Sequence, residues 1–131
     1  MTFNRVMFSS HTDKWNTPLS LYKSLDAEFL FDFDPCPADH NFDGLSSEWG
    51  QKNYVNPPYS EWAEWVKKGI QELKKGKMSV FLLPARTDTI AFHDLILPYS
   101  KEIRFIRGRL KFSGHRSGAP FPSMIVIFDD R

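Results

Sequence analysis

The segment YVNPPYS, residues 54–60, combines hydrogen-bond acceptors and an aromatic ring in an order that suggests a chemical function. An apolar run ends in a polar amide, and two prolines remove backbone donors and fix φ before an aromatic ring. The Asn56 side-chain oxygen and the Pro57 carbonyl can each accept an N–H from a planar heterocycle, while Tyr59 stacks on its face. Adenine is the obvious ligand. The alternative is an ordinary proline turn after a strand, in which Tyr59 is a packing residue.

Length and composition limit what surrounds this segment. The chain has 131 residues, of which 41% are hydrophobic, and we expect a single domain, residues 1–131, with an extended arm at residues 1–13. No segment approaches the roughly 20 apolar residues that cross a bilayer, and the amino-terminal stretch lacks a signal-peptide pattern. We therefore expect a cytoplasmic protein without a membrane partner. Cys36 is the single cysteine and the histidines show no ligand spacing, so no metal is expected.

Charges are unevenly distributed although the formal net charge is only +1. Residues 24–51 hold seven acids and no Lys or Arg, whereas residues 101–116 hold six bases and one acid. Either cluster alone is explained by a solvated surface. Together they suggest a site for a cationic small molecule beside a surface for a phosphate backbone.

Strands alternate with helices in the predicted order of elements. The strands are predicted at residues 29–34, 52–56, 78–83, 103–106 and 123–128. Helices are predicted from Thr17 as N-cap with Pro18 at the first helical position, over residues 61–75, and from Thr87 or Asp88 to Leu97. This alternation is typical of right-handed crossovers in a parallel sheet with helices on its faces.

Three of the predicted strands end in polar or proline-containing segments. These segments are Asp34-Pro35, Asn56-Pro57 and Pro84-Ala85-Arg86. In a parallel sheet they would all lie on one edge, which is where such sheets bind ligands. The sequence therefore predicts a binding site at this edge.

With these features the chain resembles the small phage-type (Dam-like) N-6-adenine DNA methyltransferases, which belong to the Rossmann-like S-adenosylmethionine-dependent methyltransferases. The resemblance extends from about Trp15 to Phe128, and the order of the segments makes it specific, whereas a lone Asn-Pro-Pro-Tyr also occurs in enzymes that methylate glutamine. The segments are WNTPLSLY (15–22), DPCP (34–37), DGL (43–45) with Trp49, NPPYS (56–60), LLPARTDT (82–89) and GRLKF (108–112). The resemblance implies a reduced Rossmann-like α/β fold with an about five-stranded, mostly parallel sheet.

The same resemblance implies S-adenosylmethionine as cofactor. Asp34 would lie at the mouth of the cofactor pocket, with Thr17 and Pro18 closing it, and Asp43 would accept from the amino group of the cofactor's adenine. The implied cofactor-binding residues are Thr17, Pro18, Asp34, Pro35, Cys36, Asp43 and Asn56. A cap or turn is the alternative for Asp34 and for Asp43.

The sequence departs from the family pattern in two places. Pro37-Ala38-Asp39 replaces the usual glycines after the first strand. The interval between Asp34 and Asn56 is too short for two additional strands, one of which normally ends in an acid for the ribose hydroxyls. No residue is therefore assigned to the ribose.

The implied reaction is transfer of a methyl group to the N6 amine of adenine in duplex DNA, with Asn56, Pro57 and Tyr59 as catalytic residues. The base must leave the stack, and stacking on Tyr59, with Phe112 or Phe121 opposite, would offset the cost. Phe112 and Phe121 are alternatively core or loop anchors. The predicted nucleic-acid-binding residues are Arg86, Arg107, Arg109, Lys111, Phe112 and Arg116.

The sequence leaves several alternatives open for the roles of these residues and for the function of the protein. A solvated surface loop is the alternative for the bases, and a helix cap is the alternative for Asp88. A basic loop, the amino-terminal arm or the second subunit of a homodimer would have to supply target specificity. An RNA-adenine or protein-glutamine methyltransferase is one rival function. A non-catalytic DNA-binding remnant that has lost cofactor affinity is another.

Overall fold

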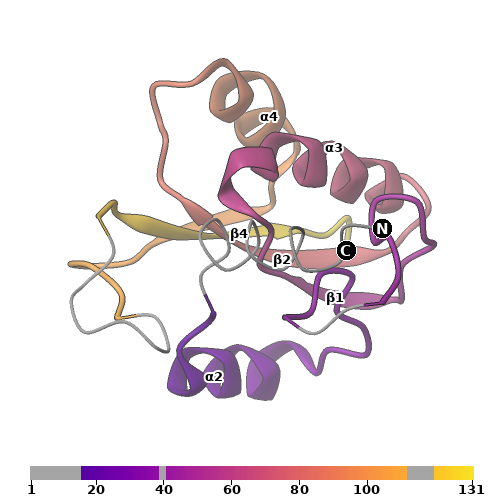
Figure 1. Cartoon of the computed structure of the whole chain (residues 1–131). Helices are drawn as coiled ribbons and strands as arrows, with labels where there is room; N and C mark the ends of the chain where they lie inside the picture. Colours follow the sequence, from indigo (N-terminus) through magenta and orange to yellow (C-terminus); the bar gives the residue numbers. More distant parts are fainter. Residues whose placement is uncertain (1–15, 39–40, 112–119) are drawn as a thin grey trace.

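The computed structural model describes residues 16–38, 41–111 and 120–131. A single sheet lies between two helical layers (Figure 1). Helix α2 (Leu19–Phe29) covers one face, whereas α3 (Trp62–Leu73) and α4 (Leu97–Tyr99) lie on the other. This layering confirms the α/β class that the alternation of elements predicted.

Four strands make up the described sheet, in the order β1-β2-β4-β3. They are β1 (Lys52–Val55), β2 (Met78–Pro84), β3 (Glu102–Phe105) and β4 (Ser123–Phe128). β1 runs parallel to β2, but β4 is antiparallel to both β2 and β3. The expectation of an about five-stranded, mostly parallel sheet is therefore wrong. β4 lies antiparallel beside β3, and an antiparallel pair does not need the crossover that parallel strands require.

The predicted first strand, residues 29–34, is also wrong. Helix α2 continues through Phe29, and Leu30 ends it in the left-handed region with φ 58°. The carboxylate of Asp26 accepts the backbone N–H of Phe31. Phe33 forms an isolated parallel bridge with Asn53, and the Lys52 carbonyl accepts the backbone N–H groups of Asp32 and Phe33 at 2.8 and 3.2 Å. The segment therefore forms a single bridge rather than a ladder, and the carboxylate of Asp32 adds a hydrogen bond from the backbone N–H of Gln51 at 3.1 Å.

The start of α2 differs from the prediction by one residue. Pro18, not Thr17, is the N-cap, and its carbonyl accepts the backbone N–H of Tyr22 at 3.0 Å. A proline has no N–H to satisfy and tolerates this position well. The Thr17 side chain makes no capping hydrogen bond and is directed elsewhere.

The helical segment after β2 is irregular. The hydroxyl of Thr89, rather than Thr87 or Asp88, accepts the backbone N–H of Phe92. Residues Phe92–Ile96 form π-helical turns, and α4 follows with Pro98 within its first turn. The helix therefore begins later than predicted and continues past Pro98.

Two apolar clusters pack on opposite faces of the sheet. Neighbouring residues of β1 show the alternation: Tyr54 belongs to the cluster on the α2 side and Val55 to the cluster on the α3 side. All residues of β2 are buried, in keeping with the near-continuous apolar run of residues 78–83. Helix α3 contributes Trp65 to the second cluster and ends before Gly76, whose φ is +87°.

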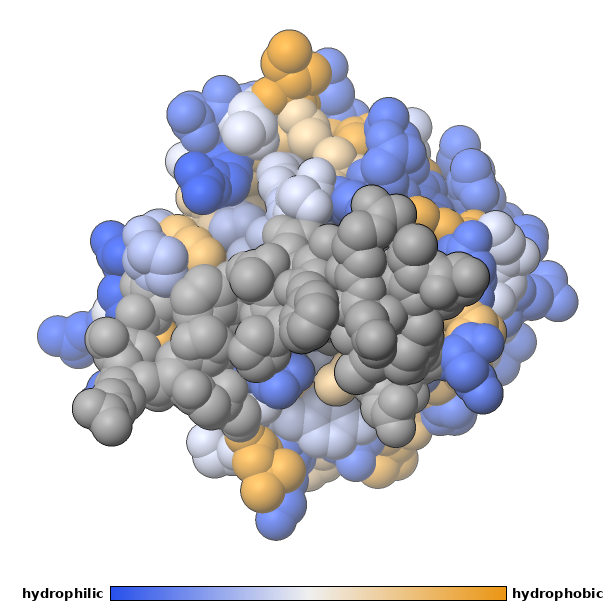
Figure 2. Space-filling view, in the orientation of Figure 1, coloured by the Kyte–Doolittle hydropathy of each residue, from blue (hydrophilic) through white to orange (hydrophobic). Residues whose placement is uncertain are grey.

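Among the described residues that Figure 2 shows, hydrophilic ones predominate and apolar ones are exposed in small groups between them. Large exposed apolar side chains include Leu30, Ile90 and Phe105. Within the described residues, no helix has the length and apolar character that a bilayer crossing requires.

Candidate active site

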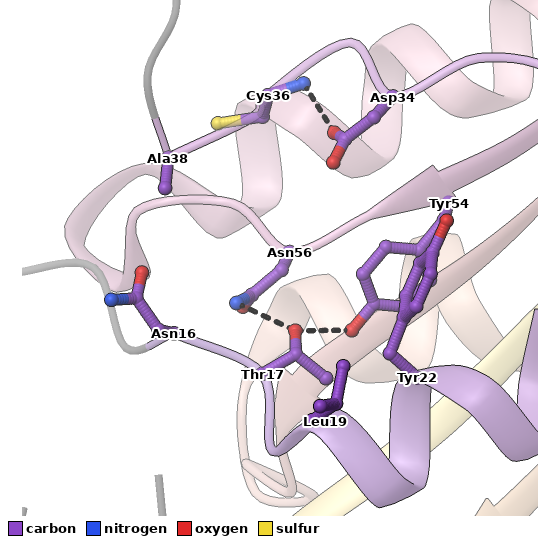
Figure 3. Close-up of a pocket in the computed structure, with 9 residues that line it drawn as sticks. All are labelled: Asn16, Thr17, Leu19, Tyr22, Asp34, Cys36, Ala38, Tyr54 and Asn56. Atoms are coloured by element: carbon purple, nitrogen blue, oxygen red, sulfur yellow. Dashed lines mark hydrogen bonds between the residues drawn. The ribbon is translucent and has the colours of Figure 1, made fainter. Parts of the chain in front are cut away.

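A pocket of about 260 Å³ opens at the carboxyl end of β1. Its walls are the end of that strand, the segment before α2 and the loop after Phe33 (Figure 3). Among the residues predicted to bind cofactor, it brings together Thr17, Asp34, Cys36 and Asn56. These residues are far apart in the sequence, and the Phe33–Asn53 bridge helps to place their segments side by side.

Asn56 follows β1 and is only 4% exposed. Its side-chain Nδ2 donates to Thr17 Oγ1 at 3.1 Å. The hydroxyls of Thr17 and Tyr54 in turn share a hydrogen bond of 2.6 Å (Figure 3). Burial raises the pKa of Tyr54 well above its ordinary value, so this phenol stays protonated and neutral.

Asp34 lines the same pocket and also organises its own loop. One carboxylate oxygen accepts the backbone N–H of Cys36 at 2.9 Å. This bond forms the local turn that was the alternative to a cofactor-binding role for Asp34. Burial, with smaller contributions from the charges of Asp26 and Asp34, raises the pKa of Tyr22 in the pocket wall. The negative charge of Asp34 therefore acts across the pocket, where it favours a cation.

Pro18 and Pro35 do not line the pocket, but each is adjacent in sequence to residues that do. Pro18 caps α2, and Pro35 is buried between the two lining residues Asp34 and Cys36. A Cβ added to Gly44 would lie 1.9 Å from the Pro35 carbonyl oxygen. Gly44 is thus needed for the close approach of its loop to the Asp34 loop.

Asp43 lies in an exposed turn outside the pocket lining. Its carboxylate accepts the backbone N–H of Leu45 at 3.0 Å and the hydroxyl of Ser46 at 2.8 Å. The turn considered for Asp43 is therefore present, and its role toward a cofactor stays a prediction.

Pro57 and Tyr59 continue the chain beyond Asn56. Pro57 is buried, and Tyr59 begins a 3₁₀ turn, Tyr59–Glu61. The Tyr59 ring packs edge-on against Phe121, with 5.0 Å between centroids, and burial raises the pKa of its phenol. Phe121 is itself 8% exposed, which agrees with an anchoring role. Stacking of Tyr59 on a base stays a prediction.

The predicted nucleic-acid-binding residues are distributed between β2 and β4. Arg86, Arg107, Arg109 and Lys111 are exposed, and Phe112 and Arg116 lie outside the described residues. Arg104, in the same basic segment, forms a bidentate ion pair with Glu28, with N–O distances of 2.7 and 2.6 Å. Its charge is therefore already neutralised within the fold.

Sequence reasoning did not single out Tyr22 or Tyr54 as site residues, yet both line the pocket. The period of two along a strand was an available signal, because it places Tyr54 on the same face as Asn56. Tyr22 lies one helical turn after Pro18. Its ring meets Tyr54 edge-on, with 5.1 Å between centroids.

A buried ionic cluster lies beside the segment that precedes β1. The carboxylate of Glu72 is 1% exposed and accepts the backbone N–H of Trp49 at 3.0 Å. Burial opposes its ionisation, but hydrogen bonds from Lys75, Trp49 and Lys77 outweigh that effect and lower the pKa of Glu72 to about 2. The Trp49 indole N–H donates to the Gly44 carbonyl at 2.8 Å. The cluster is thereby connected to the loop that packs on Pro35.

Comparison with known proteins adds one finding. The family model for DNA N-6-adenine-methyltransferase (Dam) matches residues 6–130, which is nearly the whole chain. No curated protein and no solved structure gives a significant match.

Proposed function

Since this chain belongs to the DNA N-6-adenine-methyltransferase (Dam) family, we propose that it transfers the methyl group of S-adenosylmethionine to N6 of adenine in duplex DNA. DNA adenine methylation is the activity of the family, and the donor and the residue roles are the proposal. The observation that carries it is the meeting of Asn56, Thr17 and Asp34 around one pocket.

The chemistry of the pocket suits the proposed donor. S-adenosylmethionine carries a sulfonium and an ammonium group, and the Asp34 carboxylate and the faces of Tyr22 and Tyr54 are groups that attract cations. A volume of about 260 Å³ accommodates part of such a molecule. Asp34 and Cys36 would hold it, and Thr17 lines the same wall. When bound, it supplies an electrophilic methyl group on a positively charged sulfur.

The remaining task for the protein is to orient the adenine amine. That nitrogen is a weak nucleophile because its lone pair is delocalised into the ring. The Asn56 amide oxygen and the Pro57 carbonyl can each accept one of its N–H groups, which favours a tetrahedral nitrogen with a directed lone pair. The methylated nitrogen can release its extra proton after transfer, when the donor has become a neutral thioether. Acceptors at fixed positions, rather than a base of raised pKa, are therefore the main contribution of these residues.

Duplex DNA must bind so that the target adenine reaches the pocket. The target base leaves the stack at a cost of a few kcal/mol, which contacts to the protein must offset. The exposed side chains of Arg86, Arg107 and Lys111 would contact phosphates. Tyr59 would lie beside the extruded base.

Methyl incorporation from labelled S-adenosylmethionine into duplex DNA, RNA and protein tests the reaction and its substrate together. We expect N6-methyladenine in DNA, identified by nuclease digestion and mass spectrometry. Asn56→Ala should lower the rate at least about 100-fold. Gln51→Ala removes an exposed amide just before the other end of β1 and should keep the wild-type rate.

Two results would reject parts of the proposal. Wild-type activity in Asn56→Ala would remove the role of the Asn-Pro-Pro-Tyr segment. Calorimetric titration that detects no S-adenosylmethionine binding at millimolar concentration, with DNA present, would favour the non-catalytic DNA-binding remnant.

A further inference from the structure

The hydrogen bonds around Asn56 form a chain that extends away from the turn. Nδ2 of Asn56 donates to Thr17 Oγ1, and that oxygen also bonds the Tyr54 hydroxyl (Figure 3). A hydroxyl oxygen has two lone pairs and can therefore serve both neighbours. We propose that Thr17 and Tyr54 are positioning residues that hold the Asn56 amide in the orientation needed for methyl transfer. This inference rests on the catalytic role proposed for Asn56.

The geometry of an amide makes such a hold effective. The nitrogen and oxygen of Asn56 share one plane, so a bond that holds Nδ2 also fixes the direction of the carbonyl oxygen. Without this hydrogen bond, the amide group could rotate about the Cβ–Cγ bond, because the χ2 torsion of asparagine has a broad distribution. The Thr17 bond, at 3.1 Å, restricts that turn.

Tyr54 gives Thr17 a rigid support. Its side chain is 2% exposed, and its ring is packed against two other rings. Tyr22 meets it edge-on at 5.1 Å between centroids, and Phe31 lies at 5.4 Å. A ring held in this way has little freedom, so its hydroxyl offers Thr17 a nearly fixed partner at 2.6 Å.

The positions of the three residues in the fold explain why they meet. Tyr54 and Asn56 are two residues apart at the end of β1 and therefore point to the same face of the sheet. Thr17 reaches them because α2, which starts at Leu19, lies on that face. The orientation of the Asn56 amide thus depends on the docking of α2, which is remote in sequence.

A contact of Thr17 with the cofactor alone would give different kinetics from a positioning role. Loss of a cofactor contact raises the dissociation constant and KM for S-adenosylmethionine. Loss of positioning lowers kcat while binding changes little, because the acceptor for the adenine amine is misplaced. The two roles can therefore be separated by measuring both quantities.

Three substitutions probe the chain of bonds. Thr17→Val and Tyr54→Phe each remove one hydroxyl with little change in shape, and Thr17→Ser keeps the hydroxyl. We expect kcat to fall about 10- to 100-fold in the first two variants. The dissociation constant for S-adenosylmethionine, from calorimetry, should change less than about threefold. Thr17→Ser should keep most of the wild-type kcat.

A double variant tests whether Tyr54 acts through Thr17. If it does, adding Tyr54→Phe to Thr17→Val should lower kcat little further, because the bond between the hydroxyls is already lost. Multiplication of the two single effects would instead show independent roles and would overturn the proposed chain. Thermal unfolding of each variant reports whether the fold is retained.

Nuclear magnetic resonance supplies a readout that does not depend on activity. The side-chain amide signals of Asn56 are identified by their disappearance in Asn56→Ala. In Thr17→Val they should shift and exchange with solvent faster than in the wild type, and in Thr17→Ser they should stay near their wild-type positions.

The proposal and the proposed function fail in different ways. An active Asn56→Ala variant rejects the proposed function. An inactive Asn56→Ala together with wild-type kcat in Thr17→Val and Tyr54→Phe rejects only the positioning role, as do Asn56 amide signals that both substitutions leave unchanged. A rise in the dissociation constant with unchanged kcat assigns Thr17 to cofactor contact and also overturns the positioning role.

Discussion

Replacement of Glu72 by glutamine should destabilise the fold and, with it, the wall of the pocket. The carboxylate is 1% exposed and lies 2.9 Å from Lys75 Nζ and 3.2 Å from Lys77 Nζ. Its pKa is lowered from 4.5 to about 2, which corresponds to about 3 kcal/mol of native-state stabilisation if fully expressed. Lys75 is half exposed, so screening reduces the expected loss in Glu72→Gln to about 2 kcal/mol.

The effect should depend on pH with a definite sign. A carboxyl group whose pKa is lower in the folded state stabilises the protein above its unfolded-state pKa, and this contribution is lost as pH falls through the folded-state value. For Glu72 the loss spans the interval from about pH 4.5 to about pH 2. The stability difference between the wild type and Glu72→Gln should therefore be full at pH 7 and nearly absent at pH 2.

Urea unfolding at several pH values, followed by tryptophan fluorescence, measures this difference. A loss of about 2 kcal/mol corresponds to a Tm lower by about 8 °C in a domain of this size. Glu48→Gln is a matched control, because Glu48 is 72% exposed yet lies 3.4 Å from Lys75 and 3.6 Å from Lys77. It should change stability by less than about 0.5 kcal/mol. Equal losses in the two variants, or a Glu72→Gln deficit that persists undiminished at pH 2, would refute the reasoning.

Two further predictions concern the pocket wall and the basic surface. Gly44→Ala should lower stability by about 1–3 kcal/mol and weaken S-adenosylmethionine binding, because the new Cβ would lie 1.9 Å from a backbone oxygen of Pro35. Urea unfolding and calorimetry measure both effects, and an unchanged midpoint would show that the two loops separate freely. For the basic surface, Lys111→Ala should reduce the slope of log affinity for DNA against log salt by about 1. Arg104→Ala should leave that slope unchanged, since Arg104 is paired with Glu28, and fluorescence anisotropy at several salt concentrations decides between these outcomes.

Elements with a strong apolar pattern could be predicted from the sequence. Apolar residues at helical spacing defined helix α3, and the apolar run of β2 defined a strand buried on both faces. The residues of α3 are Trp62, Trp65, Val66, Ile70 and Leu73. These patterns reflect burial directly, and burial is what fixes such elements. Asp34 and Asn56 lie at one pocket, as the expected edge of the sheet predicted, although an isolated bridge at Phe33 rather than a strand places Asp34 there.

Other features depend on competition between partners that a sequence does not rank. The hydroxyl of Thr17 could cap a helix or bond to β1, and tertiary contact with Tyr54 and Asn56 decided the matter. The alternation of residues 29–34 suggested a strand, but the side chain of Asp26 satisfies the backbone of Phe31 at the end of α2. In both places the hydrogen bond of one side-chain oxygen, Thr17 Oγ1 or the Asp26 carboxylate, decided the local structure.

The direction of β4 was mispredicted, and that direction has a consequence for the site. Because β4 is antiparallel to β2, its first residue, Ser123, pairs with Pro84 at the carboxyl end of β2. The residues before it reach the same edge, where the Pro122 carbonyl accepts the backbone N–H of Ala85 at 2.8 Å. A parallel β4 would begin at the opposite edge of the sheet.

The antiparallel arrangement also determines where the basic segment begins and ends. β3 is antiparallel to β4, with Phe105 paired to Met124, so it ends at the edge where β4 begins. The connection from β3 to β4, which carries Arg107 and Lys111, therefore leaves and rejoins the sheet at the edge that holds Asn56. Phe121, just before β4, packs against Tyr59 in the turn that follows Asn56. The strand directions thus place both ends of the candidate DNA-contacting segment at the edge that holds the candidate methyl-transfer site, which supports a nucleic acid as the polymer that presents the amine.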